Sequence, residues 1–166
     1  MGCKALFIGG IKSGKSKNAE KYILALSKEK PIYLATNEFF DDEMKKRVLL
    51  HQKQRKDTFE TLEEALHIDK AVSEQNTPVL VECVSMWINN MLYHEHTEEE
   101  IISQIDKISQ MNVQTIWVIN DVGCCVVSEN ALVREFVDIN GRIAQLLASK
   151  CEEVYNTVAG IQVKIK

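Results

Sequence analysis

The sequence predicts an α/β fold of three layers, in which helices cover both faces of a mainly parallel sheet. Apolar stretches of strand length alternate along the 166 residues with stretches of helical periodicity. Several strand-like stretches are apolar throughout, which is typical of strands buried on both faces of a parallel sheet. The chain has the length of one domain, and we expect residues 1–166 to fold as a single domain.

The first half of the chain contains two strand patterns and three helix patterns. The run Ala5-Leu6-Phe7-Ile8 predicts a strand, and the residues after it place apolar side chains on one helical face. Charged residues dominate the second helix pattern. In chain order we expect a strand at 4–8, a helix at 16–27, a strand at 31–36, a helix at 38–56 and a helix at 62–74.

The second half continues the alternation after a break at Asn76-Thr77-Pro78. Thr97 to Glu100 has the spacing of a capping box, which marks the start of a helix. Ala159-Gly160 is a turn signal between the last two strands, so these strands would add an antiparallel edge to the sheet. The expected elements are strands at 79–83, 113–120, 153–158 and 161–165 and helices at 85–93, 97–110 and 130–150.

Composition excludes several classes of protein. The net charge is −4 and no dense basic tract occurs, which argues against a dedicated nucleic-acid binder. No run of about 18 apolar residues and no signal peptide is found, so we expect no membrane segment and a cytoplasmic location. The five cysteines are odd in number and lack C-x-x-C spacing, which indicates neither a disulfide framework nor a zinc site.

The segment GGIKSGKS matches the phosphate-binding pattern G-x-x-x-x-G-K-[S/T], between a predicted strand and a predicted helix. Glycines let backbone N–H groups point at phosphate oxygens, and the lysine reaches the outer phosphates. The serine hydroxyl is a ligand for Mg²⁺. We therefore predict a P-loop that binds a nucleoside triphosphate and consists of Gly9, Gly10, Ile11, Lys12, Ser13, Gly14, Lys15 and Ser16.

A P-loop protein usually holds Mg²⁺ with a second, acidic residue at the end of a neighbouring strand. Glu82 and Asp121 both end apolar strand patterns, so either carboxylate is a candidate. We favour Glu82, with Ser16, as the metal ligands. The alternative for each is a carboxylate that faces solvent or caps a helix. No Asn-Lys-x-Asp stretch occurs, which disfavours a GTPase switch.

The charged helix carries a histidine between two arginines. Arg47, His51 and Arg55 are spaced four residues apart, which places them on one helical face. Two neighbouring cations disfavour protonation of the imidazole and also form a clamp for phosphate oxygens. A neutral imidazole is a usable nucleophile toward an α-phosphate. On spacing alone, a solvent-exposed histidine is the simpler interpretation.

Several motifs in order resemble one known family. They are GGIKSGKS at 9–16, YLAT at 33–36, DDEM at 41–44, RVLLHQKQR at 47–55, VEC at 81–83, NDVG at 120–123, SEN at 128–130, DINGR at 138–142 and GIQVKIK at 160–166. Together they span nearly the whole chain and resemble the bifunctional adenosylcobinamide kinases and adenosylcobinamide-phosphate guanylyltransferases of cobalamin biosynthesis. The chain differs from the family pattern at Cys124, Cys125, Ser128, Ala131 and Ala144.

The resemblance implies a RecA-like P-loop fold and two successive reactions. A nucleoside triphosphate, ATP or GTP, would phosphorylate adenosylcobinamide, and GTP would then donate GMP through a guanylylated histidine to give adenosylcobinamide-GDP. The catalytic residues would be His51 and Lys15, and a homotrimer is implied. Beyond the P-loop, the implied nucleotide contacts are Ala35, Thr36, Asn37, Gln52, Lys53, Gln54, Arg55, Glu63 and Glu82.

Two other functions stay open on the sequence. One is a P-loop kinase for another small alcohol, in which His51 only binds phosphate. The other is a nucleotide-dependent binding module without catalysis. The sequence does not distinguish ATP from GTP as the phosphate donor of the first reaction.

Overall fold

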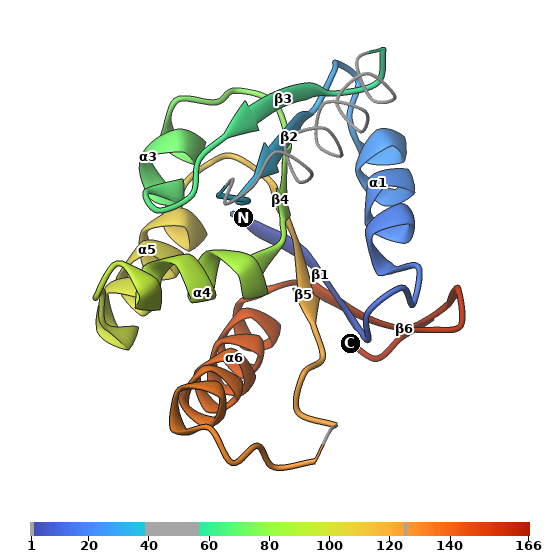
Figure 1. Ribbon diagram of the computed structural model, residues 1–166. Helices are drawn as coiled ribbons and strands as arrows, with labels where there is room; N and C mark the ends of the chain where they lie inside the picture. Colours follow the sequence, from blue (N-terminus) through green and yellow to red (C-terminus); the bar gives the residue numbers. More distant parts are fainter. Residues whose placement is uncertain (1, 39–56, 125) are drawn as a thin grey trace.

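Seven strands form one sheet in the computed structural model, which describes residues 2–38, 57–124 and 126–166 (Figure 1). The order across the sheet is β3-β2-β4-β5-β1-β6-β7. Neighbouring strands are parallel except β6 and β7, which are antiparallel. The predicted α/β class, with its antiparallel C-terminal edge, is confirmed. The strands are β1 (Cys3–Gly9), β2 (Ile32–Ala35), β3 (Glu60–Glu63), β4 (Val79–Glu82), β5 (Thr115–Asn120), β6 (Glu153–Val158) and β7 (Ile161–Lys164).

Helices cover both faces of the sheet (Figure 1). One face carries α1 (Lys15–Leu26), and the other carries α3 (Ile68–Ser73), α4 (Val84–Tyr93), α5 (Glu98–Gln110) and α6 (Ala131–Lys150). Successive strand residues point to opposite faces, so Phe7 joins the core beneath α1 while Leu6 joins the core beneath the other helices. In residues 2–38, 57–124 and 126–166, no helix is long and apolar enough to cross a membrane.

The predicted helix at 62–74 is wrong in its first part. Glu60–Glu63 form β3, and only Ile68–Ser73 are helical. Leu62 and Glu63 have good helix propensity, but pairing with β2 supplies their backbone hydrogen bonds instead. The Glu64 carboxylate then accepts hydrogen bonds from the N–H groups of Leu66 and His67, each at 2.8 Å, which turns the chain toward α3.

Two other expectations concern helices. The capping box of α5 is confirmed: Thr97 Oγ1 accepts from Glu100 N at 3.3 Å, and Glu100 Oε2 accepts from Thr97 N at 2.8 Å. The predicted charged helix at 38–56 lies, apart from Glu38, outside the described residues.

A two-residue turn joins β6 to β7. Both of its residues have positive φ, 51° at Ala159 and 82° at Gly160, as a type I′ hairpin requires. Glycine adopts such angles freely, whereas the Cβ of an alanine is crowded there. The turn therefore contains one residue suited to its conformation and one that is strained.

Replacing Ala159 with Asn should raise the free energy of unfolding by about 0.5–1 kcal/mol, because Asn tolerates the left-handed region better than Ala. Chemical denaturation measures the change. Gly160→Ala is a control with the opposite expected sign and should lower the free energy of unfolding. A Cβ at Gly160 would meet no atom within 4 Å, so a loss of stability would come from the positive φ and not from a steric clash with neighbours. A loss of stability in both variants would contradict this turn geometry.

A carboxylate on β6 links three elements. Glu153 Oε2 accepts a hydrogen bond from Tyr22 of α1 at 2.6 Å and from Tyr155 at 2.9 Å, while Lys164 of β7 contacts Oε1 at 2.9 Å. The Tyr22 hydrogen bond, followed by that from Lys164, lowers the pKa of Glu153 from 4.5 to about 2. The ionised carboxylate therefore stabilises the attachment of the hairpin to α1.

Because the pKa of Glu153 is depressed, its contribution is present above pH 4.5 and is lost as the pH falls to about 2. We expect Glu153→Gln to be less stable than the wild type at pH 7, and the difference to shrink between pH 4.5 and 2. Denaturation midpoints across this range measure it. Glu74→Gln, at an exposed position, should keep the wild-type pH dependence. A difference that stays constant with pH would contradict the assignment.

Candidate active site

The P-loop connects the end of β1 to the start of α1, as its motif predicts. Gly9 O, at the end of the strand, accepts a hydrogen bond from Asp121 N at 3.0 Å. Gly10 O accepts from Ser13 N and from Lys15 Nζ, both at 3.2 Å. The Lys15 side chain is thus folded back on its own loop, and the residue is buried.

Two glycines of the loop are required by close neighbours. A Cβ at Gly9 would lie 2.5 Å from the carbonyl oxygen of Thr157 on β6, closer than any real contact. Gly14 has a φ of 96°, and its Cβ would lie 3.1 Å from the Cα of Gly160. The loop therefore fits tightly against β6 and the turn that follows it.

The β6–β7 turn is hydrogen-bonded to the loop. Gly160 N donates to Ser13 O at 2.7 Å, and Asn18 Nδ2 of α1 donates to Gly160 O at 3.4 Å. In a trans peptide the C=O and N–H point in opposite directions. Holding the Ser13 carbonyl toward the turn therefore directs the N–H of Gly14 away from it. The motif did not reveal this role for Gly160 or Asn18; their only sequence signal was the Ala159-Gly160 turn.

The serine of the P-loop contacts one of the two candidate carboxylates. Ser16 Oγ donates to Glu82 Oε1 at 2.7 Å, so a hydroxyl and a carboxylate oxygen, the kinds of ligand that Mg²⁺ prefers, lie together. The carboxylate of Asp121 instead accepts from Gly123 N at 3.4 Å and from Cys124 Sγ at 3.3 Å within its own loop. This geometry favours Glu82 over Asp121.

Four other predicted contacts lie at the same edge of the sheet. Ala35 is paired in register with Glu63 of β3 on one side and with Glu82 of β4 on the other. Thr36 Oγ1 donates to Cys83 O at 2.9 Å and accepts from Cys83 N at 3.0 Å, which ties the end of β2 to the start of α4. Asn37 follows directly, so the fold brings the predicted residues of β2, β3 and β4 to one edge.

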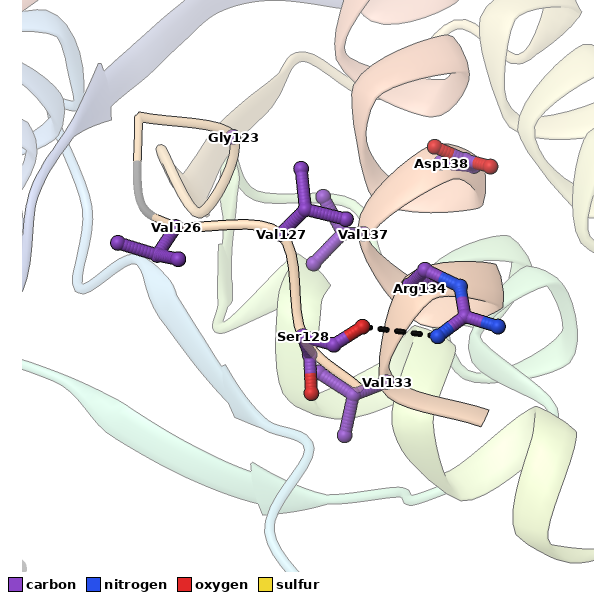
Figure 2. Close-up of a pocket in the computed structure, with 8 residues that line it drawn as sticks. All are labelled: Gly123, Val126, Val127, Ser128, Val133, Arg134, Val137 and Asp138. Carbon is purple, nitrogen blue, oxygen red and sulfur yellow. Dashed lines mark hydrogen bonds between the residues drawn. The ribbon is translucent and has the colours of Figure 1, made fainter. Parts of the chain in front are cut away.

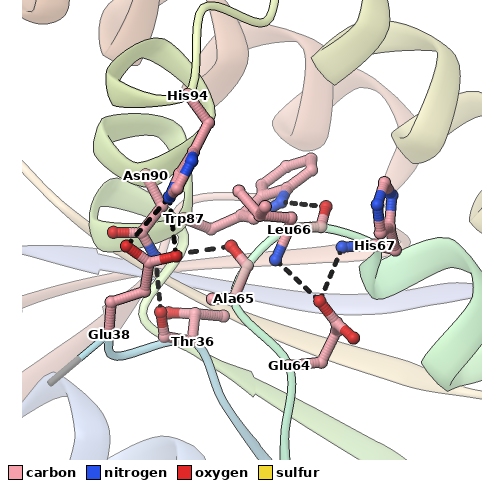
Figure 3. A network of polar contacts seen from close by, with 9 residues as sticks. All are labelled: Thr36, Glu38, Glu64, Ala65, Leu66, His67, Trp87, Asn90 and His94. Carbon is pink, nitrogen blue, oxygen red and sulfur yellow. Dashed lines mark hydrogen bonds and ion pairs between the residues drawn. The ribbon is translucent and has the colours of Figure 1, made fainter.

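A buried amide on α4 holds the segments that follow β2 and β3 (Figure 3). Asn90 Nδ2 donates to Thr36 O at 2.6 Å and to Ala65 O at 3.3 Å. Nearby, His94 Nε2 lies 2.9 Å from a carboxylate oxygen of Glu38. Sequence reasoning missed Asn90, because one asparagine in an amphipathic helix carries no signal of its partners.

The rest of the predicted site lies outside the described residues. This applies to the predicted nucleophile, the phosphate clamp and the contacts beside them: Arg47, His51, Gln52, Lys53, Gln54 and Arg55. Their roles stay predictions. Glu38 is the last described residue before them.

Comparisons with known proteins agree with the motifs. The cobinamide kinase / cobinamide phosphate guanyltransferase family matches residues 5–165. The bifunctional adenosylcobalamin biosynthesis protein CobU of Escherichia coli is 34% identical over 180 residues, which cover 97% of this chain and 98% of that relative. The bifunctional adenosylcobalamin biosynthesis protein CobP of Pseudomonas aeruginosa is 32% identical over 167 residues, covering 97% and 96%.

Among solved structures, the flagellar accessory protein FlaH of Methanocaldococcus jannaschii aligns with a TM-score of 0.53 and 12% identity. The alignment covers 99% of this chain and 78% of FlaH, and at this identity it shows the fold alone. The resemblance that the motifs suggested is confirmed by the family match over nearly the whole length. The chain therefore belongs to the family of cobinamide kinases / cobinamide phosphate guanyltransferases.

Proposed function

We propose that this chain carries out two successive reactions on one corrinoid. ATP or GTP first phosphorylates the aminopropanol hydroxyl of adenosylcobinamide, and GTP then transfers GMP to that phosphate and releases pyrophosphate. Family membership supports both reactions. The observation in the structure that best supports the proposal is the contact between Ser16 and Glu82. It lies next to the P-loop lysine, so a pair of oxygen ligands for Mg²⁺ and a cation for phosphate oxygens are close together.

The P-loop would bind the triphosphate of either nucleotide. The first turn of α1 contains no acidic residue, so the partial positive charge of its N-terminus is not offset. On binding, the Lys15 ammonium would exchange Gly10 O for oxygens of the outer phosphates, which form stronger, charge-assisted hydrogen bonds. The same loop would orient the γ-phosphorus for the kinase step and the α-phosphorus for nucleotidyl transfer.

Ser16 and Glu82 would hold Mg²⁺, because their oxygens lie 2.7 Å apart and fit a hard cation. Bound there, the ion would offset negative charge on the phosphates. Ala35, Thr36, Asn37 and Glu63, at the same sheet edge, are proposed as further nucleotide contacts.

We propose His51 as the nucleophile of the second reaction. Its imidazole nitrogen would form a bond to the α-phosphorus of GTP as the bond to the pyrophosphate oxygen breaks. The phosphate of the corrinoid would then attack that phosphorus and release His51. Arg47 and Arg55 would bind the phosphate oxygens, with Gln52, Lys53 and Gln54 beside them. The homotrimer that the family resemblance implies also stays a prediction.

Lys15→Ala should lower the rates of both reactions by about 100-fold, because it removes a cation from the charge that develops on the phosphates. Mass spectrometry of the phosphate and GDP adducts of adenosylcobinamide measures both products, with each nucleotide supplied in turn. Lys21→Ala, on the exposed face of α1, is the matched control and should retain both rates. Wild-type rates in Lys15→Ala would contradict a shared triphosphate site.

His51→Ala should abolish the acid-labile label that α-labelled GTP leaves on the protein, and with it the GDP adduct, while the kinase product still forms. His96→Ala is the control, because His96 pairs with Glu100 at the start of α5. Wild-type protein that phosphorylates a corrinoid without becoming labelled would favour a kinase without nucleotidyl transfer. Tight nucleotide binding with no corrinoid product would indicate a binding module.

A further inference from the structure

A pocket of about 310 Å³ lies between the segment after β5 and the first half of α6 (Figure 2). Its apolar lining comes from four valines, and its polar lining includes a cation and an anion one helical turn apart on α6. The residues that matter for its chemistry are Val126, Val127, Val133, Val137, Arg134 and Asp138. The site described above uses none of them.

The walls of this pocket are held in place by the protein itself. Arg134 Nη1 donates to the carbonyl oxygens of Ser128 and Glu129, each at 2.8 Å, which ties the segment to α6 (Figure 2 draws the bond to Ser128). Asn130 Oδ1 caps the same helix by accepting from Leu132 N at 2.9 Å. The pocket is therefore largely formed before a ligand arrives, which lowers the entropic cost of binding.

The apolar lining is unusually open to solvent. Val126 is 91% exposed and Val127 is 79% exposed, so neither side chain contributes to a core of this chain. Adjacent exposed valines at the rim of a pocket indicate a surface that a ligand or partner covers.

The pocket lies at the same edge of the sheet as the P-loop. Its segment begins after Asp121, whose N–H is hydrogen-bonded to Gly9 O, the first residue of that loop. Its other wall, α6, is tied to the end of β5 by the hydrogen bond from Asn140 Nδ2 to Asn120 O at 3.0 Å. A molecule that rests in the pocket therefore lies beside the edge where a phosphoryl group would be transferred.

We propose that this pocket binds one edge of the corrin ring system of the acceptor substrate, an inference that rests on the proposed function. The rim of a corrinoid carries methyl groups and uncharged primary carboxamides. The valines complement the methyl groups, Arg134 can donate to an amide oxygen, and Asp138 can accept from an amide NH₂. One cation and one anion suit uncharged amides better than a charged ligand. The pocket is much smaller than a corrinoid, so the reacting arm stays free to reach the P-loop.

The test is binding of dicyanocobinamide to the full chain, measured by equilibrium dialysis. Val126→Ser combined with Val127→Ser should weaken binding about 10-fold, as expected when methyl contacts are lost, while affinity for GTP stays unchanged. Asp138→Ala should weaken it several-fold by removing the acceptor for an amide. The matched control is Val163→Ser with Ile165→Ser, two exposed apolar residues near the C-terminus. The four apolar positions that are replaced by serine are all more than half exposed, so these substitutions should not disturb the core. Circular dichroism verifies that each variant folds.

Two outcomes would overturn the inference. Wild-type affinity in the Val126/Val127 variant would show that the pocket does not contact the corrinoid. A change in molar mass by light scattering in that variant alone would identify the valines as an interface between copies of the chain. If the wild type bound and converted no corrinoid, the proposed function itself would fail. Normal turnover by the wild type together with wild-type affinity in the Val126/Val127 variant would remove only this inference.

Discussion

The hydrogen bond from Gly160 N–H to the Ser13 carbonyl is the contact on which the conformation of the P-loop, and with it the proposed triphosphate site, depends. It supports the loop on the side of β6, while the bond from Asp121 N–H to Gly9 O supports it on the side of β5. Both supports exist because β1 lies between β5 and β6 in the sheet. The strand order therefore does more than bury apolar residues. It places a backbone N–H group, that of Asp121 or that of Gly160, on each side of the P-loop.

Two polar side chains of the P-loop have hydrogen-bond partners within the chain. Lys15 Nζ contacts Gly10 O and Ser16 Oγ contacts Glu82, whereas the buried Ser13 Oγ has no hydrogen-bond partner in the part of the chain that the structure describes. A triphosphate would have to exchange these bonds rather than add to them. For Lys15, the gain would come from replacing a neutral carbonyl acceptor with charged phosphate oxygens, which bind an ammonium more strongly.

Local patterns predicted the parts of the fold that depend on local chemistry. The P-loop spacing, the Thr97 capping box and the apolar run of β1 are each patterns that depend on only a few neighbouring residues. Leu62 and Glu63 were misread as helix because both have good helix propensity and only pairing with β2 makes them part of a strand. Gly160, Asn18 and Asn90 could not be assigned, because their partners are distant in sequence and nothing in their own neighbourhood indicates them.

The attachment of the loop to the β6–β7 turn also has a consequence for how the site comes into being. Asn18 and Gly160 are separated by 142 residues, so the loop emerges from a ribosome long before the turn that completes it. Contacts of such separation form late, after the entropy of closing the intervening chain has been overcome. A nascent chain can form β1 and α1 before β6 and β7 exist. At that stage it still lacks the Gly160 N–H, which orients the peptide group between Ser13 and Gly14. The proposed nucleotide site would therefore be complete only in the full-length chain, after β6 and β7 have formed.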